Sequence, residues 1–286
     1  MNTSEYIQYS LPFIKMQGVG NDFVLIDNRA GVDRNWPSLA VKMCDRRFGV
    51  GADGLLVVYA TENADAGMRM FNPDGSEDFC GNGLRCAARF AAAEQPRSLT
   101  IETLAGIREA NVEYSDSGEC SITVDMGLPS FRPSDVPIQM EATEAIDYPL
   151  TIDGKTWTAT SLSTGTTHTI IFVHELPDDE EFLRFSPRIE TNPLFPERTS
   201  IMWTKVESAN RISLRIWERG AGETWGCGSG ASAAAVAAIR KELVQSPVTV
   251  VSRGGCLIVA WEEDSRIEMT GPAEFVFRGT FKKSIL

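Results

Sequence analysis

The chain contains the same short motif twice: a cysteine, then Gly-x-Gly, then an alanine-rich stretch. The first copy reads "CGNGLRCAARFAAA" from Cys80, and the second reads "CGSGASAAAVAA" from Cys227. The alanine-rich stretches predict two helices, over residues 84–93 and 232–242, each beginning just after its glycines. A chain that places this turn once in each half is constrained to fold as two similar units.

Short runs rich in β-branched and aromatic residues surround both motifs and predict strands. These runs cover residues 23–27, 54–59, 99–103, 120–127, 168–173, 200–206, 212–220, 248–261 and 266–281. A third helix is predicted over residues 37–46. Most connections are short enough for hairpins. We therefore predict an α+β fold with two similar domains, each a mainly antiparallel sheet wrapped around a central helix, and an active-site cleft between them.

Prolines and polar residues interrupt the strand pattern near the middle of the chain, in "DMGLPSFRPSDVP". This break predicts an N-terminal domain over residues 1–126 that carries Cys80. A second domain over residues 127–272 carries Cys227, and a C-terminal strand in residues 273–286 returns to the first domain. Two similar domains facing each other would bring the two cysteines to opposite sides of one cleft.

Charge and hydropathy exclude several classes of partner. The 286 residues include 27 basic and 39 acidic side chains, a net charge of −12, which disfavours binding to nucleic acid. No apolar run is long enough to cross a bilayer. The first 18 residues show neither the basic start nor the apolar segment of a secretory signal. We expect a cytoplasmic protein that binds neither nucleic acid nor membranes.

The cysteine spacing argues against disulfides and zinc. The six cysteines form no CxxC pair and no cluster with the two histidines, so we expect reduced thiols and no metal site. Cys44, Cys120 and Cys256 lie in ordinary contexts, and we expect them to be small buried hydrophobic residues. Cys80 and Cys227 are the two thiols with a distinctive setting.

A cysteine at the start of a helix has particular chemistry. The first turn leaves N–H groups without partners and is the positive end of the helix dipole, so we expect the pKa of such a thiol to fall below about 8.5. The same N–H groups form a seat for a carboxylate. Two opposed thiols suit inversion of an α-carbon: one thiolate removes the proton, and the other thiol returns a proton to the opposite face. This chemistry needs no pyridoxal phosphate or other cofactor.

Several longer motifs resemble the diaminopimelate epimerase family and cover nearly the whole chain in order. They include "KMQGVGNDFVLID", "CDRRFGVGADGLL", "FNPDGSEDFCGNGLRCAARF", "WERGAGETWGCGSGASAAAVA" and "MTGPAEFVF". The resemblance implies a homodimeric, pyridoxal-independent enzyme. It would interconvert the LL and meso forms of diaminopimelate for lysine and cell-wall synthesis.

The resemblance also implies residue roles. Cys80 and Cys227 would be the acid/base pair, with His168 and Glu218 as the pair that supports them. The implied substrate-binding residues are Asn21, Asn72, Gly81, Asn82, Thr166, Ser200, Arg219, Gly228 and Ser229. Among these, the four residues that directly follow the cysteines would hold the α-carboxylate, and Arg219 suits a bidentate contact with a distal carboxylate. Glu77 and Glu223 are interpreted as structural acceptors of backbone N–H groups.

Three departures from the family pattern concern substrate recognition. The chain has "GTTH" where the family usually has Gly-Asn-Pro-His, so Thr166 replaces an asparagine. Ser200 replaces a second asparagine, and the segment from Asn72 to Cys80 is one residue shorter. A hydroxyl has fewer and shorter-reaching hydrogen-bonding groups than a carboxamide. These differences leave open a racemase or epimerase of another amino acid, such as histidine or another polar one. A non-catalytic amino-acid-binding protein is a third reading, which the two retained thiols disfavour.

Overall fold

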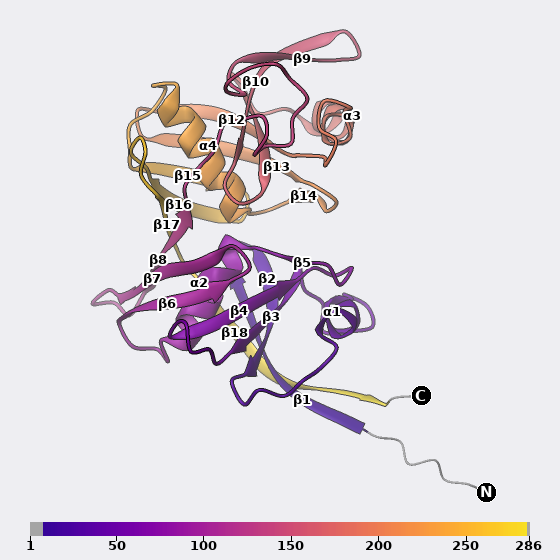
Figure 1. The fold of residues 1–286 in the computed structure, drawn as a ribbon, viewed down its shortest axis with the longest axis vertical. Coiled ribbons are helices and arrows are strands. Elements are labelled where there is room, and N and C mark those ends of the chain that lie inside the picture. The colour runs from indigo at the N-terminus through magenta and orange to yellow at the C-terminus, as the bar shows by residue number, and fades with distance from the viewer. Residues whose placement is uncertain (1–7, 285–286) are drawn as a thin grey trace, which may run out of the picture.

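Two bodies of similar build form the structure, one around helix α2 (Gly81–Ala91) and the other around helix α4 (Gly228–Arg240) (Figure 1). This computed structural model describes residues 8–284. Residues 1–7, the beginning of the segment inspected for a secretory signal, lie outside the described residues, as do residues 285–286. The two-body α+β arrangement confirms the predicted fold class.

The first body combines ten elements from the first half of the chain with its last strand. They are β1 (Gln8–Gly18), β2 (Asn21–Asn28), α1 (Trp36–Cys44), β3 (Gly54–Tyr59), β4 (Ala66–Phe71), β5 (Glu77–Asp78), α2, β6 (Arg97–Thr103), β7 (Gly106–Tyr114), β8 (Cys120–Gly127) and β18 (Glu274–Ser284).

The second body holds the remaining elements. They are β9 (Tyr148–Ile152), β10 (Lys155–Ser163), β11 (Thr167–Phe172), α3 (Asp179–Glu190), β12 (Ser200–Ser208), β13 (Arg211–Glu218), β14 (Gly222–Thr224), α4, β15 (Val248–Ser252), β16 (Gly255–Ala260) and β17 (Ile267–Gly271).

The two bodies repeat one order of elements. Strands β2 and β3 pair in parallel with α1 between them in the chain, and β11 and β12 do the same with α3 between them. Strands β4 and β6 pair in parallel with α2 between them in the chain, and β13 and β15 do the same with α4 between them. The remaining described pairs are antiparallel, including β3 with β4 and β12 with β13. The duplication that the cysteine motifs indicate therefore extends through both halves.

The two central helices are buried over most of their length. Residues Gly81–Ala88 of α2 and Gly228–Ala238 of α4 are all buried. A helix of alanine and glycine has a small radius, so strands pack closely around it, and its high alanine content favours the helix itself. Both helices begin at the glycine directly after the cysteine, three to four residues earlier than predicted, because the cysteine itself is the N-cap.

Helix α1 confirms the predicted third helix, whereas α3 was missed. Helix α3 carries few aliphatic residues and contains Pro187, which is normally a helix breaker. Its start is well marked, since the Asp178 side chain accepts the Glu181 N–H and three acidic residues follow in the first turn. Phe182 and Ile189 pack the inner face of α3 into a hydrophobic core of the second body.

Two antiparallel pairs tie the distant parts of the chain together. Strand β17 pairs with β8, and β18 pairs with β1. After β17 the chain thus leaves the second body, and β18 runs along the first (Figure 1). The exact domain limits at residues 126 and 272 remain our proposal.

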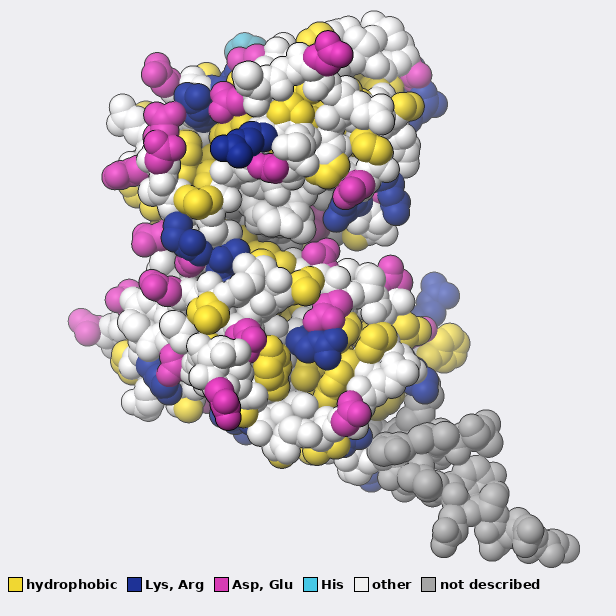
Figure 2. Space-filling view, viewed as in Figure 1, with side chains coloured by type: hydrophobic (Ala, Val, Ile, Leu, Met, Phe, Trp, Pro, Cys, Tyr) yellow, Lys and Arg dark blue, Asp and Glu magenta, His cyan; other side chains and the backbone are white. Residues whose placement is uncertain are grey.

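Acidic and basic side chains are interspersed over the face shown in Figure 2, with no large basic area. Within residues 8–284, no helix has the length and apolar character that a membrane span requires.

Candidate active site

Cys80 and Cys227 occupy the same position in two copies of one local structure. Both have extended backbones, with φ and ψ of −138° and 115° at Cys80 and −129° and 112° at Cys227. The Cys80 Sγ accepts the Gly83 N–H at 3.4 Å, and the Cys227 Sγ accepts the Gly230 N–H at 3.4 Å. Each sulfur therefore caps the positive end of a buried helix.

The two helix starts meet where the bodies join. The Asn82 Nδ2 donates to the Gly226 carbonyl oxygen at 3.3 Å, which links one motif to the residue before the other. A Cβ on Gly228 would lie 2.8 Å from the Asn82 Oδ1. Gly81 also lacks room for a side chain, because its Cβ would lie 2.7 Å from Met126 Cε. Glycine is required at both positions for this close approach.

Burial changes the acidity expected of the thiols. It raises the pKa of the Cys80 thiol to about 12 and holds the pKa of Cys227 well above its ordinary value. The N–H groups of the helix starts lower both pKa values, as the sequence argument expected, but desolvation of the thiolate is larger. The expected fall in thiol pKa was therefore wrong for this structure, in which Cys227 is only 7% exposed.

Glu218, at the end of β13, links electrostatically to both thiols. Burial raises the pKa of its carboxyl, and its side chain hydrogen-bonds to Cys227. The charge of Glu218 also raises the pKa of Cys80. Thr224 donates a short hydrogen bond to Glu218 from β14, which is paired with β13. This carboxyl group is thus held within reach of the site.

His168 is neutral and buried. Desolvation, with a smaller contribution from the charge of Arg219, lowers its pKa to about 3. Its Nε2 lies 2.9 Å from the Thr166 Oγ1, and no partner of its Nδ1 is found within residues 8–284. The Thr166 Oγ1 in turn lies 3.4 Å from the Ser229 Oγ. The Ser229 Oγ lies 3.5 Å from the Cys227 sulfur. His168 therefore connects to the second motif through Thr166.

Ser200 lies on the strand beside His168, and Arg219 directly follows the end of β13. Ser200 on β12 is the register partner of His168 on β11. Its Oγ accepts the Arg219 N–H at 3.1 Å, and the Arg219 Nη1 donates to the Glu197 carbonyl oxygen at 3.0 Å. The two residues that replace asparagines, Thr166 and Ser200, thus make hydrogen bonds within the protein.

Asn21 reaches the first motif from the start of β2. Its Oδ1 lies 3.7 Å from the Cys80 Sγ and accepts from the Asn82 Nδ2 at 3.3 Å. Asn72 differs, because its described contacts are local: its Nδ2 donates to the Ser76 Oγ at 3.0 Å. The structure therefore brings Asn21 to the thiol but shows no contact between Asn72 and the other proposed site residues.

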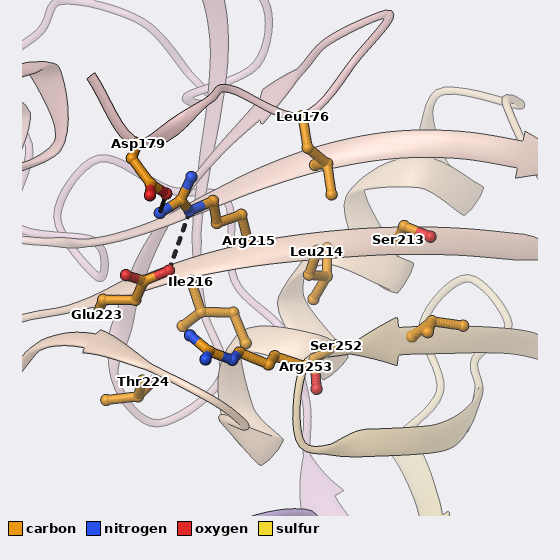
Figure 3. Close-up of a pocket in the computed structure, with 11 residues that line it drawn as sticks. Leu176, Asp179, Ser213, Leu214, Arg215, Ile216, Glu223, Thr224, Ser252 and Arg253 are labelled. Atoms are coloured by element: carbon orange, nitrogen blue, oxygen red, sulfur yellow. Dashed lines mark hydrogen bonds and ion pairs between the residues drawn. The ribbon is translucent and has the colours of Figure 1, made fainter. Parts of the chain in front are cut away.

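Glu77 and Glu223 have structural contacts of a different kind from those expected. Glu77 forms a bidentate pair with Arg69, at 2.7 Å for each bond, and Glu223 accepts from the Arg215 Nε at 3.0 Å. Figure 3 shows Arg215 between Glu223 and Asp179 in the wall of a pocket of about 390 Å³. The two glutamates thus accept hydrogen bonds from arginine side chains.

The remaining cysteines only partly follow the prediction. Cys44 is buried as expected, but Cys120 is half-buried and Cys256 is exposed. Successive side chains of a strand point to opposite faces, and Cys256 lies on the outer face of β16 with Ile258. The described residues 8–284 contain no group of three metal-binding side chains.

The family pattern described as diaminopimelate epimerase matches residues 13–132 and 160–276. The chain belongs to the diaminopimelate epimerase family. A diaminopimelate epimerase of Caldanaerobacter subterraneus subsp. tengcongensis is 45% identical over 93% of this chain and 98% of its own length. One from Desulfitobacterium hafniense is 40% identical over 96% of this chain and 100% of its own. The protein is accordingly an isomerase that acts on a small-molecule amino acid.

Solved structures of lower identity share the fold. A hydroxyproline epimerase from Agrobacterium vitis superposes with a TM-score of 0.71 at 15% identity, covering 96% of this chain and 92% of its own. A phenazine biosynthesis protein of the PhzF family from Bacillus anthracis superposes with a TM-score of 0.67 at 20% identity, covering 97% and 100%. The two-body arrangement thus recurs in solved structures.

Sequence reasoning missed two charged residues close to the first motif. Asp53 accepts from the Asn21 Nδ2 at 2.8 Å, and Arg85 donates to the Asn82 Oδ1 at 2.8 Å. Both stand inside quoted motifs, Asp53 in "GVGADGLL" and Arg85 in "CGNGLRC". Their signal in the sequence is a charged residue among glycines and apolar residues, since Asp53 stands between Ala52 and Gly54 and Arg85 stands within the first motif.

Proposed function

We propose that this protein interconverts LL- and meso-diaminopimelate by proton transfer between two thiols. The observation that carries the proposal is the contact between two cysteine-capped helix starts, one from each body. The relatives that match over nearly the full chain support diaminopimelate as the substrate. They give no support to a histidine racemase or to a non-catalytic binding protein. We also propose a cytoplasmic homodimer.

In the proposed reaction, one cysteine is a thiolate and the other a thiol. The thiolate takes the α-proton from one face of the substrate, and the thiol gives its proton to the opposite face of the carbanion. Inversion leaves the two sulfurs with exchanged protonation states, so the same site runs the reverse reaction. A thiolate whose pKa is raised by burial is a stronger base, which suits a weakly acidic Cα–H.

The helix starts provide electrostatic stabilisation. The N–H groups of Gly81, Asn82, Gly228 and Ser229 would hold the α-carboxylate and the charge that develops beside it. Glu218, hydrogen-bonded to Cys227, is placed to take up a thiol proton. Neutral His168 positions Thr166 and through it Ser229. Arg219 would bind the distal carboxylate.

The test follows the α-proton in D₂O with LL-diaminopimelate as substrate. Deuterium should enter the α-carbon as the meso form appears, and Cys80→Ala or Cys227→Ala should abolish inversion. The exposed Cys256 offers a matched control, and Cys256→Ala should retain full activity. A panel of L-amino acids, histidine included, tests the substrate. Turnover of another amino acid with diaminopimelate inert would refute the proposal, as would full activity in either alanine variant at Cys80 or Cys227.

A further inference from the structure

Arg85 is a buried cation beside the first thiol without a carboxylate partner among residues 8–284. Its side chain is 0% exposed. Its Nε donates to the Pro272 carbonyl oxygen at 3.2 Å, its Nη1 lies 3.4 Å from the Met269 sulfur, and its Nη2 donates to the Asn82 Oδ1 at 2.8 Å. A buried charge is costly unless its surroundings compensate it, so its retention beside the site requires an explanation.

Arg85 stands at one end of a series of hydrogen bonds in which donors and acceptors can be arranged in only one way. Because a guanidinium only donates, the Asn82 Oδ1 must face Arg85, and the Asn82 Nδ2 then faces the Asn21 Oδ1 at 3.3 Å. The Asn21 Nδ2 must therefore face the other way, where it donates to the Asp53 Oδ2 at 2.8 Å.

Asp53 ends the chain because a carboxylate only accepts. The same Oδ2 also accepts the Asp22 N–H at 3.0 Å, and its Oδ1 lies 2.7 Å from the Arg46 Nη2. With a donor-only group at one end and an acceptor-only group at the other, neither carboxamide can flip. The Asn21 oxygen is consequently held towards the Cys80 sulfur, 3.7 Å away.

We propose that Arg85 and Asp53 are positioning residues that act through Asn82 and Asn21 to set the balance between thiol and thiolate at Cys80. The proposal rests on the proton transfer proposed above. An amide oxygen facing the sulfur stabilises the thiol, which can donate to it, and Asp53 is what keeps that oxygen there. The uncompensated charge of Arg85 stabilises the thiolate. Asp53 thus favours the thiol form of Cys80, and Arg85 favours the thiolate form.

Another charged group that acts on Cys80 is Glu218 from β13, which favours the thiol; Cys86 lies on the same helix α2. Burial lowers the pKa of Arg85 only to about 10, so its guanidinium is charged at neutral pH. Glu218 itself is unchanged in the Arg85 and Asp53 variants below, although the charge of Asp53 contributes to the raised pKa of its carboxyl.

The experiment measures the rate of Cys80 alkylation by iodoacetamide between pH 7 and 9 in the full-length protein, with the Cys80 peptide quantified by mass spectrometry. This range lies below the pKa of Cys80, so the rate is proportional to the thiolate fraction, and a change of one unit in the apparent pKa changes the rate about tenfold. Arg85→Gln removes the cation, and the apparent pKa of Cys80 should rise by about one unit. Asp53→Asn removes a negative charge and lets Asn21 turn its NH₂ towards the sulfur. The apparent pKa should then fall by about one unit. Arg85→Lys keeps the charge and should stay closer to wild type than Arg85→Gln.

Two matched controls separate positioning from general damage. Arg89 lies one turn further along α2, over the Phe275 ring at 4.9 Å, and Arg46 is the outer partner of Asp53. Arg89→Gln and Arg46→Gln should leave the Cys80 titration within about 0.3 units of wild type. Shifts of the same sign in Arg85→Gln and Asp53→Asn would overturn the proposal, because loss of structure alone would move both variants together. An Arg89→Gln shift equal to that of Arg85→Gln would overturn it as well.

The readout needs no substrate, so it fails independently of the proposed function. Inactivity of the wild type towards diaminopimelate would refute the proposed function. The alkylation of Cys80 in the variants would still test the roles of Arg85 and Asp53. If Arg85→Gln does not fold, the sign of the Asp53→Asn shift and the behaviour of Arg85→Lys decide it. In active preparations, Arg85→Gln should lower kcat at least about tenfold with KM changed less than about threefold.

Discussion

The carboxamide of Asn82 occupies the space that a side chain on Gly228 would need. A Cβ on Gly228 would lie 2.8 Å from the Asn82 Oδ1 and 3.2 Å from its backbone nitrogen. Gly228, the residue after Cys227, thus touches Asn82, the second residue after Cys80. This contact, between positions far apart in the chain, brings the two helix starts into one site.

Gly228→Ala should therefore push the two helix starts apart. Asn82 is held by Arg85 and by the Gly226 carbonyl oxygen, so it cannot simply move aside. Because displacement of reacting groups by about 1 Å costs about 100-fold in rate, we expect a loss of kcat of that order. Steady-state epimerisation assays measure it.

Gly31→Ala is the control for that substitution. Gly31 has a φ of +72° and no atom within 4 Å of its Cβ position, so alanine there adds backbone strain without a clash at the site. Its thermal stability should fall slightly while kcat stays at the wild-type value. Wild-type kcat in Gly228→Ala would show that the close approach is not needed.

Thr166→Val should weaken both stability and activity. Valine has nearly the shape of threonine but no hydroxyl, so the Nε2 of buried His168 would lose its 2.9 Å partner. An unsatisfied buried polar group costs about 1–3 kcal/mol, and a similar loss in the transition state lowers kcat about tenfold or more. Urea unfolding and kinetics test the two effects.

The neighbouring Thr167→Val provides the comparison. Thr167 is buried and begins β11, the strand of His168, and its side chain makes no hydrogen bond to the His168 ring among the described residues. It should keep kcat near the wild-type value. Equal losses in the two variants would mean that the hydroxyl of Thr166 has no special part.

His168 should make the folded protein less stable as the pH falls. Its pKa is about 3 in the fold, against 6.5 ordinarily, so between these values the unfolded chain binds a proton that the folded chain does not. The free energy of unfolding therefore falls as the pH drops from about 6.5 towards 3. In His168→Gln this contribution should be absent, and urea unfolding between pH 7 and 4.5 should show a shallower decline.

His174→Gln is the matched substitution at an exposed histidine. A decline as steep in His168→Gln as in the wild type would contradict the assignment of this pH dependence to His168.

Mild oxidation with diamide should link Cys80 to Cys227 and inactivate the enzyme. The helix starts that carry the thiols are in contact, so the two sulfurs can each lose a proton and together two electrons to the diamide. The expected products are a disulfide and reduced diamide. Mass spectrometry without reduction should show the Cys80–Cys227 peptide, and a thiol reductant should restore activity. Inactive, oxidised protein with both thiols free would count against a shared site.

Local sequence patterns were sufficient for much of the architecture. The alanine-rich stretches indicated α2 and α4, and the strand "CSITVDMG" coincides with β8. Helix α3 escaped because Pro187 and its charged surface obscure the periodicity. The internal duplication could have predicted α3, since α3 occupies the place in the second half that α1 occupies in the first.

The sequence alone determined that each of the two cysteines lies just before a helix, because helix propensity and glycine turns depend on a few adjacent residues. Only the tertiary structure decided how acidic those thiols are, since burial outweighs the helix ends and raises the pKa of both. It also decided which groups surround Cys80: Asp53, Asn21 and Arg85 are separated in the chain and meet only after the strands and helices have packed. Desolvation and such contacts depend on every segment that covers the site, and no local pattern encodes them.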